Sequence, residues 1–233
     1  VWGVQILAGA PQDAFYTFLA SVLFLICSVS SSRPAGKSLL QVASIVVLLF
    51  SLGTGLSAVQ IVPALELIKE SVRASLATYE MVTMGSYPLQ GVITLLLPQF
   101  FGSYVDGTVW IGNVPWSIPQ QTLYTGILPL VLLGFVSLRS NGPKRFAIFG
   151  GLTAVLSLVL AFGHHTPLYK LVYLLPGFDR FRAPSKIMVL WGFSIALLAG
   201  LGMDGLLRYV REKHARRLVL LLSLVISLIV LDL

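Results

Sequence analysis

Charged residues and cysteines are scarce in this chain of 233 residues. Only 11% of the residues are charged and 56% are apolar, against about 25% and about 45–50% in ordinary soluble domains. A soluble globule needs a charged surface, which 16 Lys and Arg with 9 Asp and Glu cannot cover. The one cysteine, Cys27, lies inside an apolar run, which excludes a disulfide framework and a cysteine-based metal site. The sequence therefore predicts a protein whose solvent is the lipid bilayer.

Apolar runs of spanning length, or nearly so, follow one another along the chain. A helix needs about 20 apolar residues to cross a bilayer, and a lipid-exposed strand would leave its backbone groups unpaired. We therefore predict an all-α, polytopic transmembrane helical bundle with about six spanning helices, forming a single domain over residues 1–233. The predicted spans are residues 14–30, 39–62, 123–138, 146–162, 187–207 and 218–233.

The two ends of the chain indicate a fragment. The first residue is Val1, no signal peptide opens the chain, and the last apolar run stops at 16 residues. We expect an internal fragment of a longer protein, truncated at both ends.

The positive charges are sorted between the connections. Ten of the sixteen Lys and Arg fall in three short connections on one side of the predicted spans, and short basic loops face the cytoplasm. The longer connections, residues 63–122 and 163–186, then face outward. In the first of them, residues 63–76 form a predicted amphipathic helix at the membrane interface, with Pro63 near its first turn. The net charge of +7 is thus explained by loop charge, and we expect no nucleic-acid partner.

Two motifs that resemble functional signatures have structural explanations. Residues 200–205 match the GxGxxG pattern, but they lie inside a predicted span rather than between a strand and a helix. His164 and His165 are adjacent, so their side chains should point apart, and we expect no histidine metal site. Small residues that recur every four positions predict close helix packing: Gly192, Ala196, Gly200 and Asp204.

Carboxylates in the outer loops are candidate bases, and they are also potential ligands for a divalent cation. No other cofactor is indicated. Glu66 stands out because it sits where a predicted span leaves the membrane, and a carboxylate at that depth needs a partner. The alternative for Glu66 is an ion pair with Lys69 or Arg73 on the same helix.

Residues 178–186, Phe-Asp-Arg-Phe-Arg-Ala-Pro-Ser-Lys, place three cations directly before a predicted span, on its outer side. The positive-inside rule does not account for cations there. Arginine holds phosphate through two parallel hydrogen bonds, which makes the segment a candidate site for a lipid phosphate. The alternative is that these side chains reach into ordinary headgroups, with an ion pair to Asp179. The candidate substrate-binding residues are Arg182, then Arg180 and Arg73.

Several short motifs occur in the order and spacing of a known family. They are Leu7-Ala8-Gly9-Ala10-Pro11-Gln12 with Phe15-Tyr16, Gln60-x-x-Pro63-x-x-Glu66-Leu67, Leu96-Leu97-Pro98-x-Phe100-Phe101-Gly102, Thr166-Pro167-Leu168-Tyr169, and Leu175-Pro176-Gly177-Phe178 with Phe181-Arg182-x-Pro184. With this set the chain resembles the middle of the YfhO-type bacterial polytopic membrane proteins. The resemblance implies a GT-C type glycosyltransferase of the bacterial cytoplasmic membrane, with its long loops outside.

Such an enzyme moves a sugar from a polyprenyl-phosphate carrier to a glycan acceptor of the cell envelope. The resemblance places the catalytic acid in a first outer loop, which we expect upstream of Val1, so that Asp13 and Glu66 are only weak candidates within this chain. The alternatives are a transporter or flippase for a lipid-linked glycan and a non-catalytic envelope-assembly scaffold. The predicted spans carry almost no charge at mid-membrane, which favours surface chemistry over transport.

Overall fold

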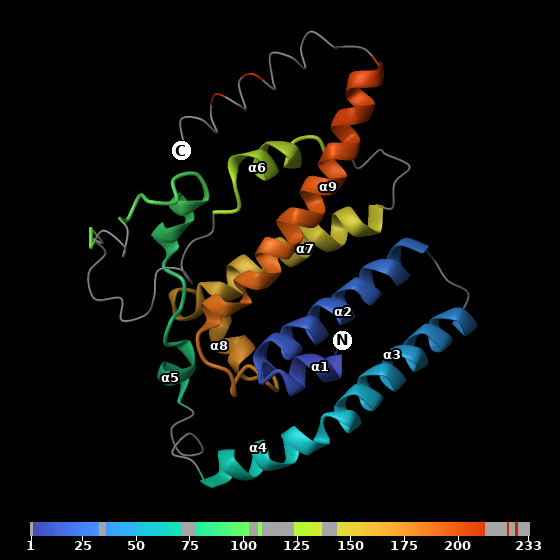
Figure 1. Ribbon diagram of the computed structural model, residues 1–233, viewed down its shortest axis with the longest axis vertical. Coiled ribbons are helices and arrows are strands. Elements are labelled where there is room, and N and C mark those ends of the chain that lie inside the picture. The colour runs from blue at the N-terminus through green and yellow to red at the C-terminus, as the bar shows by residue number, and fades with distance from the viewer. Residues whose placement is uncertain are drawn as a thin grey trace. The chain divides into compact units, whose positions relative to one another are not determined.

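The computed structural model describes residues 2–32, 36–70, 78–102, 107–108, 124–136 and 144–212, together with Ser223 and Ser227. Every regular element in these ranges is a helix, and no strand occurs in them, which confirms the predicted all-α class. The helices divide between two compact units (Figure 1). Unit 1 comprises Val1–Met84 and Leu168–Ala183, and unit 2 comprises Gly85–Pro167 and Pro184–Leu233.

Unit 1 is built around a short first helix that packs between two long ones. Trp2 of this helix lies against Phe18 and Phe50, with ring centroids 6.1 Å and 4.7 Å apart, and its indole nitrogen donates a hydrogen bond to Thr54 Oγ1 at 3.1 Å. Packing of these three aromatic rings supplies apolar contact, with edge-to-face geometry between Phe50 and each of the other two. The helices of unit 1 are α1 (Trp2–Leu7), α2 (Pro11–Ser32), α3 (Gly36–Leu56), α4 (Ala58–Glu70), α5 (Tyr79–Thr83) and α8 (Leu168–Tyr173).

The α3–α4 pair is bent by 70° at Ser57. Ser57 is fully buried, and its hydroxyl lies 2.9 Å from the carbonyl oxygen of Gly3 and 2.8 Å from that of Gly53. A serine that bonds to the carbonyl four residues earlier tends to bend its helix. The prediction that a new helix begins near Pro63 is therefore wrong: the break lies at Ser57, where α1 contacts the chain, and Pro63 lies inside α4.

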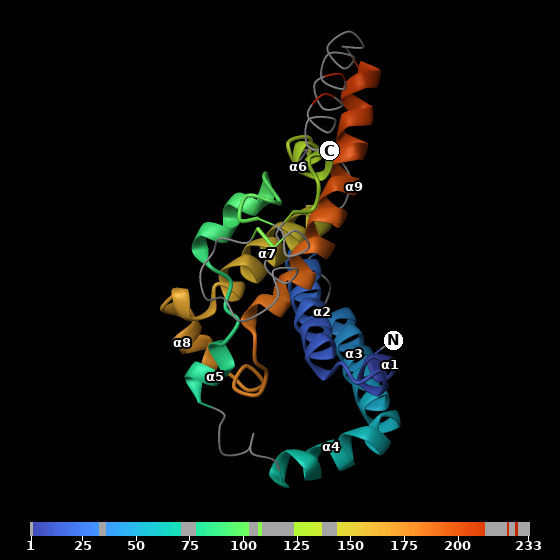
Figure 2. The ribbon, with the colours of Figure 1, turned by 60° about the vertical axis from the view of Figure 1, so that its left-hand side comes forward.

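Unit 2 is organised by α9, which lies beside α7 in both ribbon views (Figures 1 and 2) and also packs against α6. Close approach of α6 is allowed by two glycines of α9. A Cβ atom on Gly202 would collide with the carbonyl oxygen of Leu132, and one on Gly205 with that of Phe135. The elements of unit 2 are η2 (Leu89–Leu95), α6 (Ile127–Leu133), α7 (Lys144–Ala161), η4 (Gly163–His165), η5 (Pro184–Ile187) and α9 (Met188–Glu212).

The predicted stripe of small residues is wrong in register. A Cβ atom on Gly192 or Gly200 would meet no described atom within 4 Å. The glycines that make the close contacts, Gly202 and Gly205, lie on a different side of α9, because 100° of helix rotation separates successive residues. Small residues do enable helix packing here, but on the face that meets α6.

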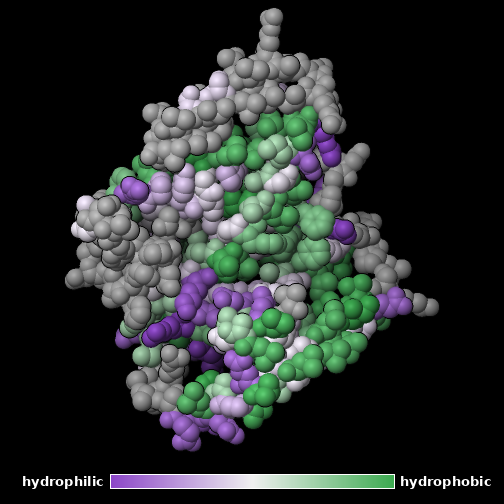
Figure 3. Space-filling view, in the orientation of Figure 1, coloured by the Kyte–Doolittle hydropathy of each residue, from purple (hydrophilic) through white to green (hydrophobic). Residues whose placement is uncertain are grey.

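Among the described residues, three helices are long and apolar enough to cross a membrane: Pro11–Val29, Lys144–Ala161 and Pro184–Tyr209. The number rises to four if the bent α3–α4 pair forms one span. Apolar side chains cover the surface of α3 and of much of α9 (Figure 3), and Leu48, Leu52 and Leu56 are each more than half exposed. So much exposed apolar surface indicates a membrane protein.

Two of the six predicted spans are not among these helices. Within residues 123–138 the structure describes only α6, whose seven residues are too few to cross a bilayer. The run 218–233 lies outside the described residues except for Ser223 and Ser227.

Exchange of Gly202 for alanine tests the packing of α6 against α9. Because the added methyl group collides with the backbone of Leu132, we expect Gly202→Ala to destabilise the protein by about 1–3 kcal/mol, seen as a lower Tm in detergent micelles. Gly200→Ala on the same helix is the matched control and should be neutral or stabilising by up to about 1 kcal/mol. Equal losses in the two variants would contradict the contact.

Candidate functional site

Four segments of unit 1 meet at the start of α2: the first turns of α2, helix α5, helix α8, and residues 177–183, which we call the arginine loop. The Gln12 side chain donates a hydrogen bond from Nε2 to the carbonyl oxygen of Arg182 at 3.1 Å. The backbone nitrogen of Ala183 donates to the carbonyl oxygen of Val82 in α5 at 3.2 Å. The arginine loop is thus tied by its backbone to two helices that lie far from it in the sequence.

Aromatic packing holds the other end of the arginine loop. The ring of Phe15 lies 5.2 Å from that of Phe178 and 5.5 Å from that of Phe181, measured between centroids. Gly177 has a φ of +95°, and a Cβ atom at this position would lie 2.7 Å from the Phe15 ring. Only glycine fits here, because both the backbone conformation and the close approach of Phe15 exclude a side chain.

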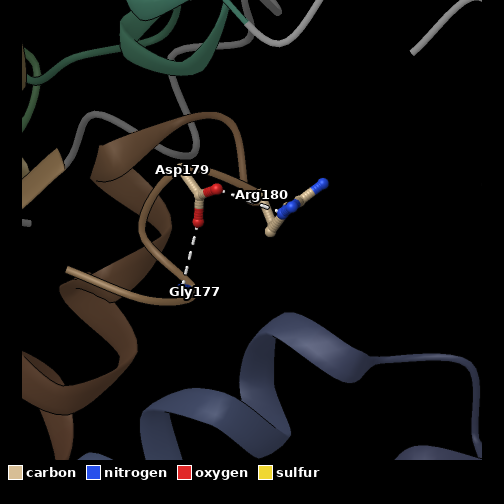
Figure 4. A network of polar contacts seen from close by, with 3 residues as sticks. All are labelled: Gly177, Asp179 and Arg180. Carbon is tan, nitrogen blue, oxygen red and sulfur yellow. Dashed lines mark hydrogen bonds and ion pairs between the residues drawn. The ribbon is translucent and has the colours of Figure 1, made fainter. Parts of the chain in front are cut away.

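The arginine loop begins with a tight polar turn (Figure 4). The Asp179 carboxylate accepts a hydrogen bond from the backbone nitrogen of Gly177 at 3.1 Å and forms an ion pair with Arg180 Nε at 3.1 Å. The Arg180 side chain remains 68% exposed. The ion pair with Asp179 that sequence reasoning offered as the alternative reading of this segment is therefore present, but it uses only one edge of the Arg180 guanidinium group.

Backbone strain marks the end of the loop. Ala183 has a φ of +63°, the only positive φ among the non-glycine residues in the described part of the chain. Residues with a side chain seldom adopt this conformation, and where they do the surrounding contacts must enforce it. Here two hydrogen bonds enforce the conformation: Gln12 Nε2 donates to the carbonyl oxygen of Arg182, and the backbone nitrogen of Ala183 donates to the carbonyl oxygen of Val82. The Arg182 side chain is exposed.

The structure brings together some of the predicted site residues and separates others. Asp13 is exposed in the first turn of α2, directly after the Gln12 that holds Arg182. Glu66 is exposed on α4, and among the described residues it forms no ion pair, so of the two partners considered for it Lys69 is not one. Arg73 lies outside the described residues. Arg180 and Arg182 therefore form the candidate phosphate site, and Asp13 is an exposed carboxylate on the helix turn that binds their loop.

Sequence reasoning missed a set of buried polar side chains beneath this site. Tyr16 and Tyr169 are 5% and 4% exposed. Gln12 Nε2 donates a second hydrogen bond to the Tyr16 hydroxyl at 2.7 Å, and Tyr169 lies close enough to Tyr16 to interact with it electrostatically. These residues occur in the motifs that carry the family resemblance, but nothing in their sequence spacing indicates that they meet. Nothing in the sequence singles out Tyr16 and Tyr169, because tyrosines near a membrane surface ordinarily belong to the aromatic belts at the membrane–water interface.

Burial also keeps the phenol of Tyr169 neutral. Desolvation, with a smaller contribution from the nearby Tyr79, raises the pKa of Tyr169 to about 12. At physiological pH the hydroxyl of Tyr169 is therefore a neutral group that both donates and accepts hydrogen bonds.

The two adjacent histidines belong to unit 2. Their rings lie 4.0 Å apart between centroids, so the prediction that they point apart is wrong. Both are exposed in the 3-10 turn η4, where the backbone nitrogen of His164 donates a hydrogen bond to the Ser86 hydroxyl at 3.1 Å. Partial burial, and then the neighbouring His164, lower the pKa of His165. Among the described residues, no group of three or more His, Cys, Asp or Glu side chains is arranged to hold a metal ion.

Comparisons with known proteins identify no relative of this chain. The chain matches no protein-family model, and searches of curated proteins and of solved structures return no match. The candidate site must therefore be interpreted from its own geometry.

Proposed function

We propose that this chain is part of a membrane glycosyltransferase that takes a sugar from a polyprenyl-phosphate carrier and transfers it to a glycan of the cell envelope. The main structural support for this proposal is the arginine loop. Its backbone is bonded to Gln12 and Val82 and its aromatic side chains pack on Phe15, while the side chains of Arg180 and Arg182 are exposed. A fixed backbone that presents exposed guanidinium groups is suited to binding a phosphate group, since less conformational freedom is lost when the ligand binds.

The proposed chemistry is a direct displacement at the anomeric carbon of the carrier-bound sugar. A carboxylate accepts the proton of the acceptor hydroxyl as the hydroxyl oxygen bonds to that carbon. The bond between the carbon and the phosphate oxygen breaks, and the electron pair leaves with the polyprenyl phosphate. Arg182 and Arg180 stabilise the negative charge that develops on the leaving phosphate. Asp13 and Glu66 are the two candidate bases among the described residues, and we test Asp13 first because its exposed carboxylate lies in the helix turn whose Gln12 binds the Arg182 backbone.

The membrane arrangement belongs to the same proposal. We propose a bacterial cytoplasmic membrane protein of about six spans, in which residues 123–138 and 218–233 add crossings to those of α2, α3–α4, α7 and α9. The outer side then holds the arginine loop, in keeping with the distribution of Lys and Arg among the short connections. The resemblance to YfhO-type proteins supports this arrangement and the GT-C type activity.

A transporter or flippase for a lipid-linked glycan is the second candidate, and the break between α3 and α4 favours it. Transporters often build their substrate sites from interrupted helices, whose ends leave backbone groups available for a ligand. At the α3–α4 break, however, the buried Ser57 hydroxyl bonds to carbonyl groups of the chain itself. We therefore prefer the glycosyltransferase.

Exchange of Arg182 for alanine tests phosphate binding. Loss of a bidentate, charge-assisted contact should weaken polyprenyl-phosphate binding to the purified protein about 10- to 100-fold and lower sugar transfer. Arg182→Lys should retain part of the affinity, because lysine keeps the charge but lacks the planar fork. Lys170→Ala removes an exposed cation from α8 of the same unit and serves as the control. Unchanged affinity and unchanged transfer in Arg182→Ala would contradict the role.

Exchange of Asp13 for asparagine tests the proposed base. Removal of a general base typically lowers the rate about 10²- to 10⁴-fold, so we expect transfer to fall by at least about 100-fold while polyprenyl-phosphate affinity stays within about twofold. Glu66→Gln alters an exposed carboxylate on α4 and should retain transfer. Full transfer by Asp13→Asn would remove Asp13 from the mechanism, and loss of carrier binding would indicate a structural role instead.

A further inference from the structure

Tyr79 combines a partly exposed ring with a buried hydroxyl. It opens helix α5, whose position is fixed by the Thr78 side chain, which accepts a hydrogen bond from the backbone nitrogen of Met81. Its ring packs edge to face on that of Tyr173 of α8, with centroids 5.5 Å apart. The Tyr79 hydroxyl oxygen is buried and has no hydrogen-bond partner among the described residues.

This hydroxyl differs from that of its neighbour Tyr16. The Tyr16 hydroxyl is also buried, but it accepts a hydrogen bond from Gln12 at 2.7 Å. A buried hydroxyl without a partner destabilises a protein, and such a group in a native structure is often explained by function or by an ordered water molecule. Tyr79 thus carries a hydrogen bond donor whose partner is not supplied by the described part of the chain.

The surroundings of Tyr79 favour a neutral ligand oxygen. Tyr169, which interacts with Tyr79 electrostatically, is itself a neutral phenol, and the next residue along α5 is the carboxylate Glu80. An anion buried among neutral groups and near a carboxylate would be costly. A phosphate is better accommodated by the exposed arginines of the arginine loop. The backbone bond between Val82 of α5 and Ala183 keeps the helix that carries Tyr79 attached to that loop.

We propose that Tyr79 is a binding residue for the sugar of the lipid-linked substrate, donating its hydroxyl proton to a sugar oxygen while Arg182 binds the phosphate. The partly exposed rings of Tyr79 and Tyr173 add an apolar surface of the kind on which a pyranose packs. This inference rests on the proposed function, since it assigns the sugar-binding part of the same substrate site.

Exchange of Tyr79 for phenylalanine tests the inference in the intact protein, reconstituted in phosphatidylcholine nanodiscs. Two probes are titrated: bare polyprenyl phosphate, and polyprenyl phosphate that carries glucose, galactose or N-acetylglucosamine. Tyr79→Phe should weaken binding of the best-bound sugar-bearing lipid about tenfold and leave binding of the bare lipid unchanged. Because the hydroxyl has no described partner in the protein, the Tm without ligand should not fall. Tyr16→Phe is the matched control, and loss of its bond to Gln12 should lower the Tm by about 2–4 °C.

The other outcomes overturn the inference in distinguishable ways. A fall in the Tm of Tyr79→Phe with unchanged lipid binding would show that the hydroxyl has a structural partner, such as an ordered water molecule. Equal weakening for both lipids would place the hydroxyl on the phosphate rather than the sugar. Binding of both lipids with equal affinity by the wild-type protein would show that the sugar is not recognised, while phosphate binding stands. A wild-type protein that binds neither lipid would overturn the proposed function and this inference together.

Discussion

The attachment of the arginine loop to the first turn of α2 is the constraint on which the rest of the site depends. Gln12 bonds to the carbonyl oxygen of Arg182, and Phe15 packs between Phe178 and Phe181. These contacts join residues that are about 170 positions apart in the chain. They involve the backbone and the apolar side chains of the loop, and the side chains of Arg180 and Arg182 are exposed. The loop can therefore keep its shape while its charges remain exposed to a ligand.

The same contacts separate two electrostatic environments. Above them lie the exposed groups Asp13, Arg180 and Arg182, whose charges are solvated and suited to an anionic ligand. The phenols of Tyr16 and Tyr169 are buried, and burial raises the pKa of Tyr169 to about 12. The Gln12 side chain joins the two environments, because it donates one hydrogen bond to the buried Tyr16 hydroxyl and another to the carbonyl oxygen of Arg182. A lipid-linked sugar has a charged phosphate next to a neutral ring of hydroxyl groups, and this division of charge matches the two environments.

Hydrophobic runs predicted the long helices well, because helix formation in a membrane depends mainly on the length and apolarity of one continuous segment. The break at Ser57 was not predictable in this way, since it depends on the contact of α1 with α3. The register of the glycine contacts on α9 also depends on the helix that packs there. In the site, Arg182 and Arg180 were predicted from their unusual charge. Gln12, Tyr16 and Tyr79 were not, because their importance arises from tertiary contacts between distant segments.

A double-mutant cycle between Gln12→Leu and Arg182→Ala, measured as polyprenyl-phosphate affinity, tests the central claim most directly. If Gln12 acts by holding the arginine loop, Gln12→Leu will weaken binding severalfold when Arg182 is present and will have little further effect in the Arg182→Ala background. Losses that simply add, or a Gln12→Leu protein that binds the carrier as well as the wild type, would contradict the account.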